Sequence, residues 1–99
     1  MEAGRYGRGV VRRKQERYDR GMRSRPVVAT LSENLRGLRR RKGLTQERAA
    51  EATGLAYRHY QAIENQERAG VQLATVERLA RGLGVEAWEL VQPERYPNI

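Results

Sequence analysis

Residues 43–65 read GLTQERAAEATGLAYRHYQAIEN, and this stretch decides the fold. Thr45 is a good N-cap for the helix QERAAEAT that follows it, and the alanines of that helix favour close backbone packing. Gly54 interrupts the helix, and only a few residues separate it from the next one, AYRHYQAIEN. Two short helices joined by a tight glycine-containing turn indicate a helix-turn-helix, in which the second helix can enter the major groove of DNA.

A further helix is expected directly upstream. Thr30 and Glu33 form a T-x-x-E capping box before leucines at helical spacing. This pattern predicts a helix that starts after Thr30, runs to about Lys42 and stops at Gly43.

Two more helices are expected downstream, after the polar loop NQERAGVQ. Apolar residues at helical spacing predict a fourth helix from Leu73 to Leu83, which Gly84 ends. A short fifth helix should cover about Glu86 to Val91, before Pro93. We find no strand pattern and no internal repeat, so the domain is predicted to be all-α with five helices over residues 30–92.

Charge is distributed unevenly along the chain. The 99 residues carry 20 Lys and Arg against 12 Asp and Glu, a net charge of +8. Residues 1–30 alone hold nine cations against three acids, a net charge of +6, whereas residues 31–92 hold ten against eight. We therefore divide the chain into a basic Gly/Arg-rich arm (1–29), a domain (30–92) and a short tail (93–99). The arm is either a solvated leader or a segment that contacts DNA or RNA.

The composition also excludes several classes of protein. The chain has no cysteine, so disulfides and thiolate metal sites are absent, and its apolar runs are too short for a signal peptide or a membrane span. His59 is the only histidine, and the acids form no pocket-like pair. We expect a soluble, cytoplasmic (nucleoid-associated) protein without metal, cofactor, membrane contact or catalytic residues.

At this point the chain resembles the lambda-repressor and Cro family of DNA-binding domains, also called the XRE family. The resemblance covers about two thirds of the chain. It is carried, in order, by LRGLRRRKGLTQERAAEATGL (35–55), IEN (63–65) and LATVERLARGLGVEAWELV (73–91). It implies a five-helix lambda-repressor-like helix-turn-helix domain that binds operator DNA as a symmetric dimer. The chain departs from the family pattern in four places. Ala49 stands for a leucine, Ala56 for a capping Ser or Thr, and Tyr60 for an aliphatic core residue. In the loop after Glu64, Asn65-Gln66 stands where a glycine is common.

One arc of the helix at 56–65 is predicted to read bases. A step of about 100° per residue places five residues on this arc, and Tyr60 and Ile63 on the opposite side. Arg58 can pair with guanine, Gln61 can reach adenine or a phosphate, and Tyr57 can contact a thymine methyl or a phosphate. The resemblance adds Ala62 as a base-contacting position. The arc consists of Tyr57, Arg58, Gln61, Ala62 and Asn65; its alternative role is that of an ordinary solvated surface.

Other candidate roles follow from the resemblance. Gln46 matches a family glutamine that binds a backbone phosphate, and the family makes further phosphate contacts in the loop of Asn65 and Arg68. Arg39 and Glu64 match a structural ion pair between the first and third helices. The full set of phosphate candidates is Thr45, Gln46, Asn65, Arg68 and Arg41, the last from a solvated arginine face.

Trp88 lies near the edge of the inward face of the fifth helix. Family members often dimerise through this region, so Trp88 and Val91 are a candidate dimer interface. The competing interpretation is that Trp88 covers the small core.

Two hypotheses of function remain. The first is a sequence-specific regulator of transcription that binds double-stranded DNA, a repressor acting as a homodimer on a palindromic operator, in a bacterium or phage. The second is an interaction module: the antitoxin of a toxin pair, or a bridging factor whose arm contacts RNA, the ribosome or RNA polymerase.

Overall fold

The structure is a computed structural model. It describes residues 26–98 of the chain. Its described part is all-helical, with five helices in the expected order. These are α3 (Val27–Arg41), α4 (Gln46–Thr53), α5 (Tyr57–Glu64), α6 (Leu73–Leu83) and α7 (Ala87–Leu90).

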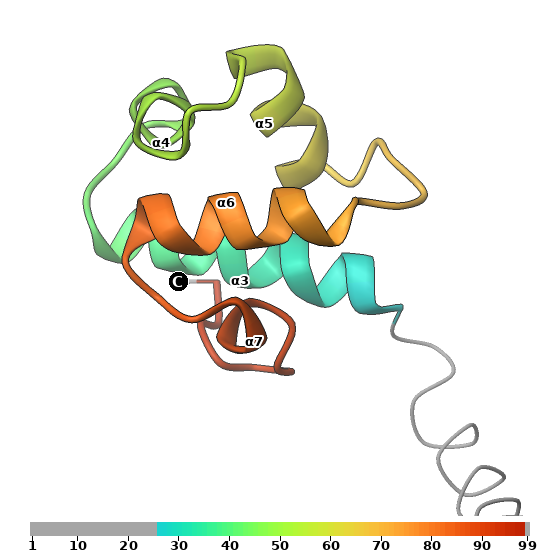
Figure 1. The fold of residues 1–99 in the computed structure, drawn as a ribbon. Helices are drawn as coiled ribbons and strands as arrows, with labels where there is room; N and C mark the ends of the chain where they lie inside the picture. Colours follow the sequence, from blue (N-terminus) through green and yellow to red (C-terminus); the bar gives the residue numbers. More distant parts are fainter. Residues whose placement is uncertain (1–25, 99) are drawn as a thin grey trace, which may run out of the picture.

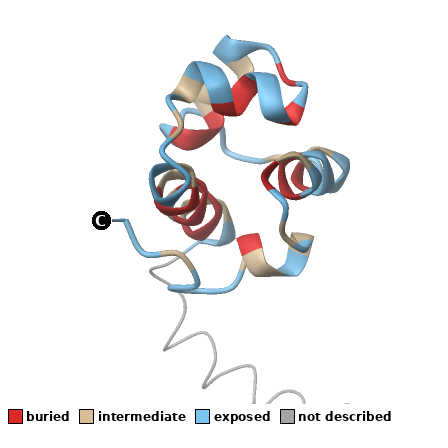
Figure 2. Cartoon of the chain, turned by 90° about the vertical axis from the view of Figure 1, so that its left-hand side faces the viewer, coloured by how far each residue is buried: buried red, intermediate tan, exposed pale blue. Residues whose placement is uncertain are grey.

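The helices surround one core. α4 packs against α5 and α6, α3 packs against α5 and α7, and α6 packs against α7. α4 and α5 lie at one end of the domain and α7 at the other, with α3 and α6 between them (Figure 1). In the view of Figure 2, the buried residues of the helices face the space that the helices surround.

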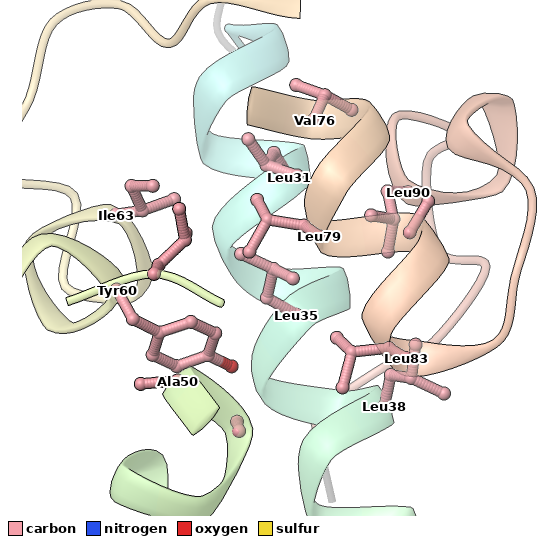
Figure 3. Close-up of a cluster of buried hydrophobic side chains, with 13 residues drawn as sticks. Leu31, Leu35, Leu38, Ala50, Tyr60, Ile63, Val76, Leu79, Leu83 and Leu90 are labelled. Carbon is pink, nitrogen blue, oxygen red and sulfur yellow. The ribbon is translucent and has the colours of Figure 1, made fainter. Parts of the chain in front are cut away.

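Leucines supply most of the core, as the helical spacing predicts. Leu35 on α3, Leu79 on α6 and Leu90 on α7 are all fully buried. Tyr60 is also fully buried and belongs to the same core cluster (Figure 3). The position where the family has an aliphatic residue therefore holds a phenol inside the core, and its hydroxyl must find a partner there.

The predicted start of the first helix is wrong. α3 begins at Val27, with Pro26 as N-cap in an extended conformation. The Thr30 N–H donates to Pro26 O at 3.2 Å, and the Thr30 side chain is buried in the second turn. Proline favours a helix start directly after it, because it has no N–H to donate within a helix and disfavours the α conformation in the preceding residue. The capping box at Thr30 and Glu33 is therefore not formed, and α3 includes three residues that were assigned to the arm.

The residues after α7 pack back onto α3. Asn34 Nδ2 donates to Leu90 O and Gln92 O, both at 2.8 Å, and its Oδ1 accepts the Tyr96 N–H at 2.9 Å. Gly37 permits this close approach, because a Cβ there would clash with the carbonyl oxygen of Tyr96. The folded unit therefore includes most of the segment that the sequence suggested was only a tail.

Candidate nucleic-acid interface

Local signals in the sequence fix the turn between α4 and α5. Thr45 Oγ1 accepts the Arg48 N–H at 3.1 Å, as expected of an N-cap. Gly54 ends α4 with φ of 77°, a left-handed conformation that glycine adopts without strain. Leu55 then turns into the core, and its N–H donates to Ala50 O at 3.1 Å. These contacts fix the turn and so set the direction in which α5 leaves α4.

α5 presents two different faces. Tyr60, Ile63 and Glu64 are buried against the rest of the domain. On the opposite side Tyr57 is 42% exposed, and Arg58 is exposed. Gln61 and Ala62 are half-buried at the border of this outward surface, and Asn65 is exposed at its end. All five residues of the predicted base-reading arc are thus accessible at least in part.

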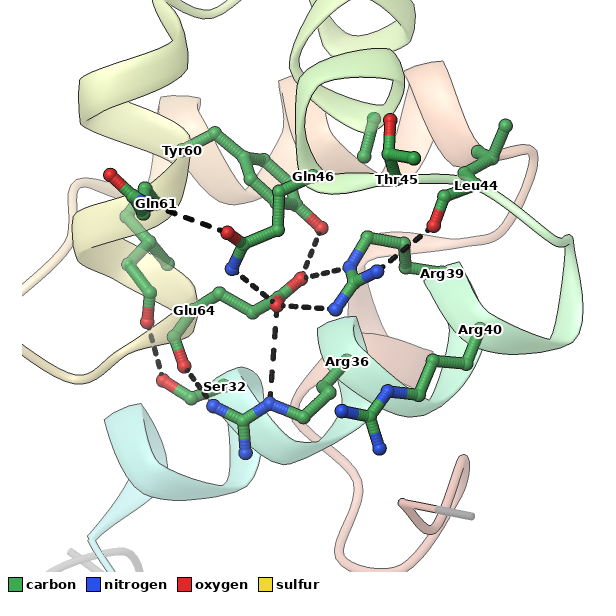
Figure 4. A network of polar contacts seen from close by, with 12 residues as sticks. Ser32, Arg36, Arg39, Arg40, Leu44, Thr45, Gln46, Tyr60, Gln61 and Glu64 are labelled. Carbon is green, nitrogen blue, oxygen red and sulfur yellow. Dashed lines mark hydrogen bonds and ion pairs between the residues drawn. The ribbon is translucent and has the colours of Figure 1, made fainter.

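Glu64 is the centre of a buried polar network (Figure 4). Its Oε2 accepts Arg39 Nε at 2.8 Å and the Tyr60 hydroxyl at 2.7 Å. Its Oε1 accepts Arg39 Nη2 at 2.9 Å and Gln46 Nε2 at 2.8 Å. The structure therefore brings together Arg39 and Glu64, the pair that the family resemblance implies, and adds Tyr60 and Gln46 as partners.

The network controls the protonation of its members. Burial acts to raise the pKa of Glu64, but the hydrogen bonds from Arg39, Tyr60 and Gln46 outweigh burial and leave this pKa below its ordinary value. The hydrogen bond to Glu64 raises the pKa of the Arg39 guanidinium. Burial, followed by the bond to Glu64, raises the pKa of the Tyr60 phenol. Glu64 is thus a carboxylate at neutral pH, able only to accept hydrogen bonds.

The network continues to the outward surface through two amides. Gln46 Oε1 accepts Gln61 Nε2 at 3.4 Å, and the same Nε2 donates to the Tyr57 hydroxyl at 3.2 Å. Gln46 is half-buried. A candidate phosphate contact therefore also links the buried ion pair to two candidate base contacts.

A shallow depression of about 500 Å³ opens between α3, α4 and α5. Arg36 lines it, and sequence reasoning gave this residue no role. Its Nη2 donates to Glu64 O at 2.7 Å, so it binds the last carbonyl of α5. The i, i+3 and i, i+4 spacing of Arg36, Arg39 and Arg40 on one helix face was the available signal. The depression is lined by Arg36, Arg39, Arg40, Thr45, Gln46, Glu47, Tyr57, Glu64 and Asn65.

Arg41 and Arg68, the remaining phosphate candidates, lie outside this depression. Arg41 Nη1 donates to Pro97 O at 3.2 Å, and its guanidinium lies 5.9 Å from the centre of the Tyr96 ring. Arg36 and Arg40 line the depression beside α5, although Arg40 Nη1 also donates to Asn98 Oδ1 at 2.7 Å. Arg68 is exposed in the loop between α5 and α6.

The candidate dimer residues lie at the other end of the domain. Trp88 is 57% exposed and is not part of the buried core, so it does not act as a core cover. The Arg95 guanidinium lies 5.5 Å from the Trp88 ring centre. Val91 is half-buried and lines a separate apolar groove of about 320 Å³ that also includes Val27 and Leu73.

Within residues 26–98 we find no group of three or more His, Cys, Asp or Glu side chains placed to hold a metal ion. None of the five described helices combines the length and the apolar character needed to cross a lipid bilayer.

Comparison with known proteins gives three matches. The family model described as Helix-turn-helix matches residues 35–87. A curated protein of Neisseria meningitidis serogroup B, named a hypothetical transcription factor, is 37% identical over 65 residues, which are 66% of this chain and 60% of the relative. The chain thus spans about 60% of the length of that relative. The crystal structure of a hypothetical transcription factor from Neisseria matches with a TM-score of 0.65 and 34% identity over 69% of this chain and 77% of that one.

Proposed function

Because the chain belongs to the lambda-repressor-like helix-turn-helix family, we propose that it binds double-stranded DNA and regulates transcription, with α5 in the major groove. One observation supports this most: α5 is held to the core by one face, while Tyr57 and Arg58 project from the other. The names of the relatives, both hypothetical transcription factors, are consistent with this role.

In this proposal base recognition and phosphate binding are separate. Tyr57, Arg58, Gln61 and Ala62 meet base edges, with Arg58 suited to the O6 and N7 atoms of guanine. Gln46 uses one amide hydrogen on Glu64, and its second hydrogen remains to donate to a phosphate. Thr45, Asn65 and Arg36 line the depression beside α5, where a phosphate backbone would pass.

We further propose that the protein is a repressor that binds a palindromic operator as a homodimer. Two copies would place their α5 helices in successive major grooves, about 34 Å apart. The exposed Trp88, with the neighbouring Val91, is the surface we assign to dimer formation. Sedimentation velocity checks this: Trp88→Ala should shift the protein to monomer, whereas Gln92→Ala, an exposed neighbour, should not.

Selection of bound sequences from a random duplex pool tests the function. We expect enrichment of a motif with two inverted half-sites. Arg58→Ala should relax the base preference at one position in each half-site, while Arg81→Ala, an exposed arginine on α6, should leave the motif unchanged. A uniform loss of affinity across all sequences would make Arg58 a phosphate contact instead. No enrichment, together with tight binding to structured RNA or to a co-purified protein, would favour the interaction-module hypothesis.

The basic arm lies outside the described residues except for Pro26 and the three residues that belong to α3. We propose that it adds sequence-independent affinity, because its excess of arginine can displace counterions from DNA. Removal of residues 1–25 should then flatten the dependence of affinity on salt. Replacement of the arm's arginines by glutamine keeps its length and should have the same effect. An unchanged salt dependence would show that the arm does not touch DNA.

A further inference from the structure

A continuous chain of hydrogen bonds runs from the buried carboxylate of Glu64 to the surface of α5. It passes through Gln46 and Gln61 and ends at Tyr57. Glu64 is fully buried, Gln46 and Gln61 are half-buried, and Tyr57 is 42% exposed. The chain thus leads from the interior to the side chains that face outward.

The direction of every bond in this chain is set at its buried end. A carboxylate cannot donate, so Gln46 must turn its Nε2 toward Glu64 Oε1. Its Oε1 therefore faces Gln61. Because this oxygen can only accept, Gln61 must turn its own Nε2 inward. A reversed amide at either residue would place two acceptors, or two donors, against each other.

The two hydrogens of the Gln61 amide are then both used. One bonds to Gln46 Oε1 and the other to the Tyr57 hydroxyl oxygen. Gln61 is left with Oε1 as its outward group. Tyr57 already accepts a hydrogen bond through its oxygen, which leaves its hydroxyl hydrogen to donate outward.

We infer that Glu64, acting through Gln46, fixes the hydrogen-bonding character that α5 offers to DNA, with Gln61 as a pure acceptor and Tyr57 as a donor. This inference rests on the proposed function. In the major groove, the groups that donate to such an acceptor are the exocyclic amines of adenine and cytosine. Gln61 therefore selects a base that carries an amine, and Gln46 is a positioning residue for it.

This mode of recognition differs from that of an unconstrained glutamine. A free glutamine pairs with adenine at two points, accepting from N6 and donating to N7. Gln61 has no amide hydrogen left for N7, so its contact to adenine involves only the amine. The same acceptor rejects guanine and thymine, which present O6 and O4 acceptors at the corresponding place.

Base analogues test the inference once the selected operator is in hand. Gln61→Ala first identifies the base pair that Gln61 reads, as the position whose preference is lost. If adenine stands there, 7-deazaadenine, which lacks N7, should bind with nearly unchanged affinity. Unsubstituted purine, which lacks the amine, should weaken binding about five-fold, as expected for one lost hydrogen bond. An equal loss with both analogues, or a larger loss with 7-deazaadenine than with purine, would overturn the inference.

If cytosine stands there, the analogue is 2-pyrimidinone, which lacks the N4 amine. It should weaken binding to the same extent, and unchanged affinity would overturn the inference.

Gln46→Met tests the positioning role, because methionine keeps the length and removes both hydrogen-bonding groups. It frees the Gln61 amide, which can then turn to donate to a base. The ratio of affinities for natural and 7-deazaadenine operators should rise above one in this variant. A ratio is used because it cancels any loss of a phosphate contact by Gln46. Gln92→Met, exposed after α7, is the matched control and should keep the wild-type ratio.

A measurement without DNA separates this inference from the proposed function. In NMR spectra of the free protein, the side-chain amide resonances of Gln61 should shift in Gln46→Met and stay in place in Gln92→Met. Unmoved Gln61 resonances would overturn the chain of bonds, whatever the protein binds. Shifted resonances with no enriched duplex would instead overturn DNA binding, and with it the base-reading role of Gln61.

Discussion

Arg39 and Glu64 form a two-point ion pair inside the domain, with Nε to Oε2 at 2.8 Å and Nη2 to Oε1 at 2.9 Å. Glu64 is fully buried, and only 11% of the Arg39 side chain is exposed. The pair joins α3 to the end of α5. It therefore holds the proposed recognition helix at a fixed angle to the rest of the domain.

Removal of one partner of this pair should destabilise the folded domain. Arg39→Ala leaves a buried carboxylate without its main counter-charge, and we expect it to lower the free energy of unfolding by about 3–5 kcal/mol. Urea unfolding followed by circular dichroism measures this. Arg81→Ala, on the exposed face of α6, should change stability by less than about 0.5 kcal/mol. Equal costs for the two variants would show that the pair does not stabilise the fold.

Stability should also depend on pH through Glu64. Its folded-state pKa lies below the ordinary value of 4.5, because the hydrogen bonds of its partners outweigh the opposing effect of burial. The unfolded chain thus binds more protons in acid. The contribution of Glu64 is present above pH 4.5 and is lost as the pH falls through the folded-state pKa.

Urea midpoints between neutral pH and acid provide the measurement. The free energy of unfolding should decrease below pH 4.5, and Glu64→Gln should show a shallower decrease from a lower starting value. Glu77→Gln, an exposed carboxyl on α6, should keep the wild-type slope. If Glu64→Gln retains the wild-type slope, the acid sensitivity arises from other carboxyls.

The start of α5 offers a stabilising change. Ala56 is its N-cap, with φ of −60° and ψ of 143°, and its side chain makes no capping hydrogen bond. Serine suits this backbone and can accept from the first turn, so Ala56→Ser should add about 1 kcal/mol. Thermal melting would show a higher Tm. Ala69→Ser, in the exposed loop before α6, should leave Tm nearly unchanged; a similar rise there would argue against capping as the cause.

Local signals predicted the arrangement of α4, α5 and α6 because each boundary depends on residues close in sequence. Thr45 caps α4, and Gly54 and Gly84 end α4 and α6 in left-handed conformations. The predicted start of α3 was wrong, and the cause is again local. Two local signals competed there, and the proline at position 26 prevailed over the capping box at Thr30.

The sequence pattern did not predict the contacts between residues that are distant in the sequence. Arg36 and Arg41 belong to one arginine-rich helix, yet the first binds the end of α5 and the second binds the chain after α7. Gln46 was expected only at a phosphate, and its bonds to Glu64 and Gln61 became visible once α3, α4 and α5 were packed. Such contacts depend on where helices meet, which helical periodicity does not specify.

Asn34 is the residue that secures the chain after α7, and its loss is the last prediction. Asn34→Leu removes the partner of two carbonyls, Leu90 O and Gln92 O, and of the Tyr96 N–H. Buried backbone groups left without partners cost about 1–3 kcal/mol, so we expect a loss of stability in this range and faster hydrogen exchange at Tyr96. Removal of residues 93–99 should reduce the cost of Asn34→Leu, because Tyr96 is then absent. Equal costs in the full and shortened chains would show that Asn34 acts only through Leu90 and Gln92.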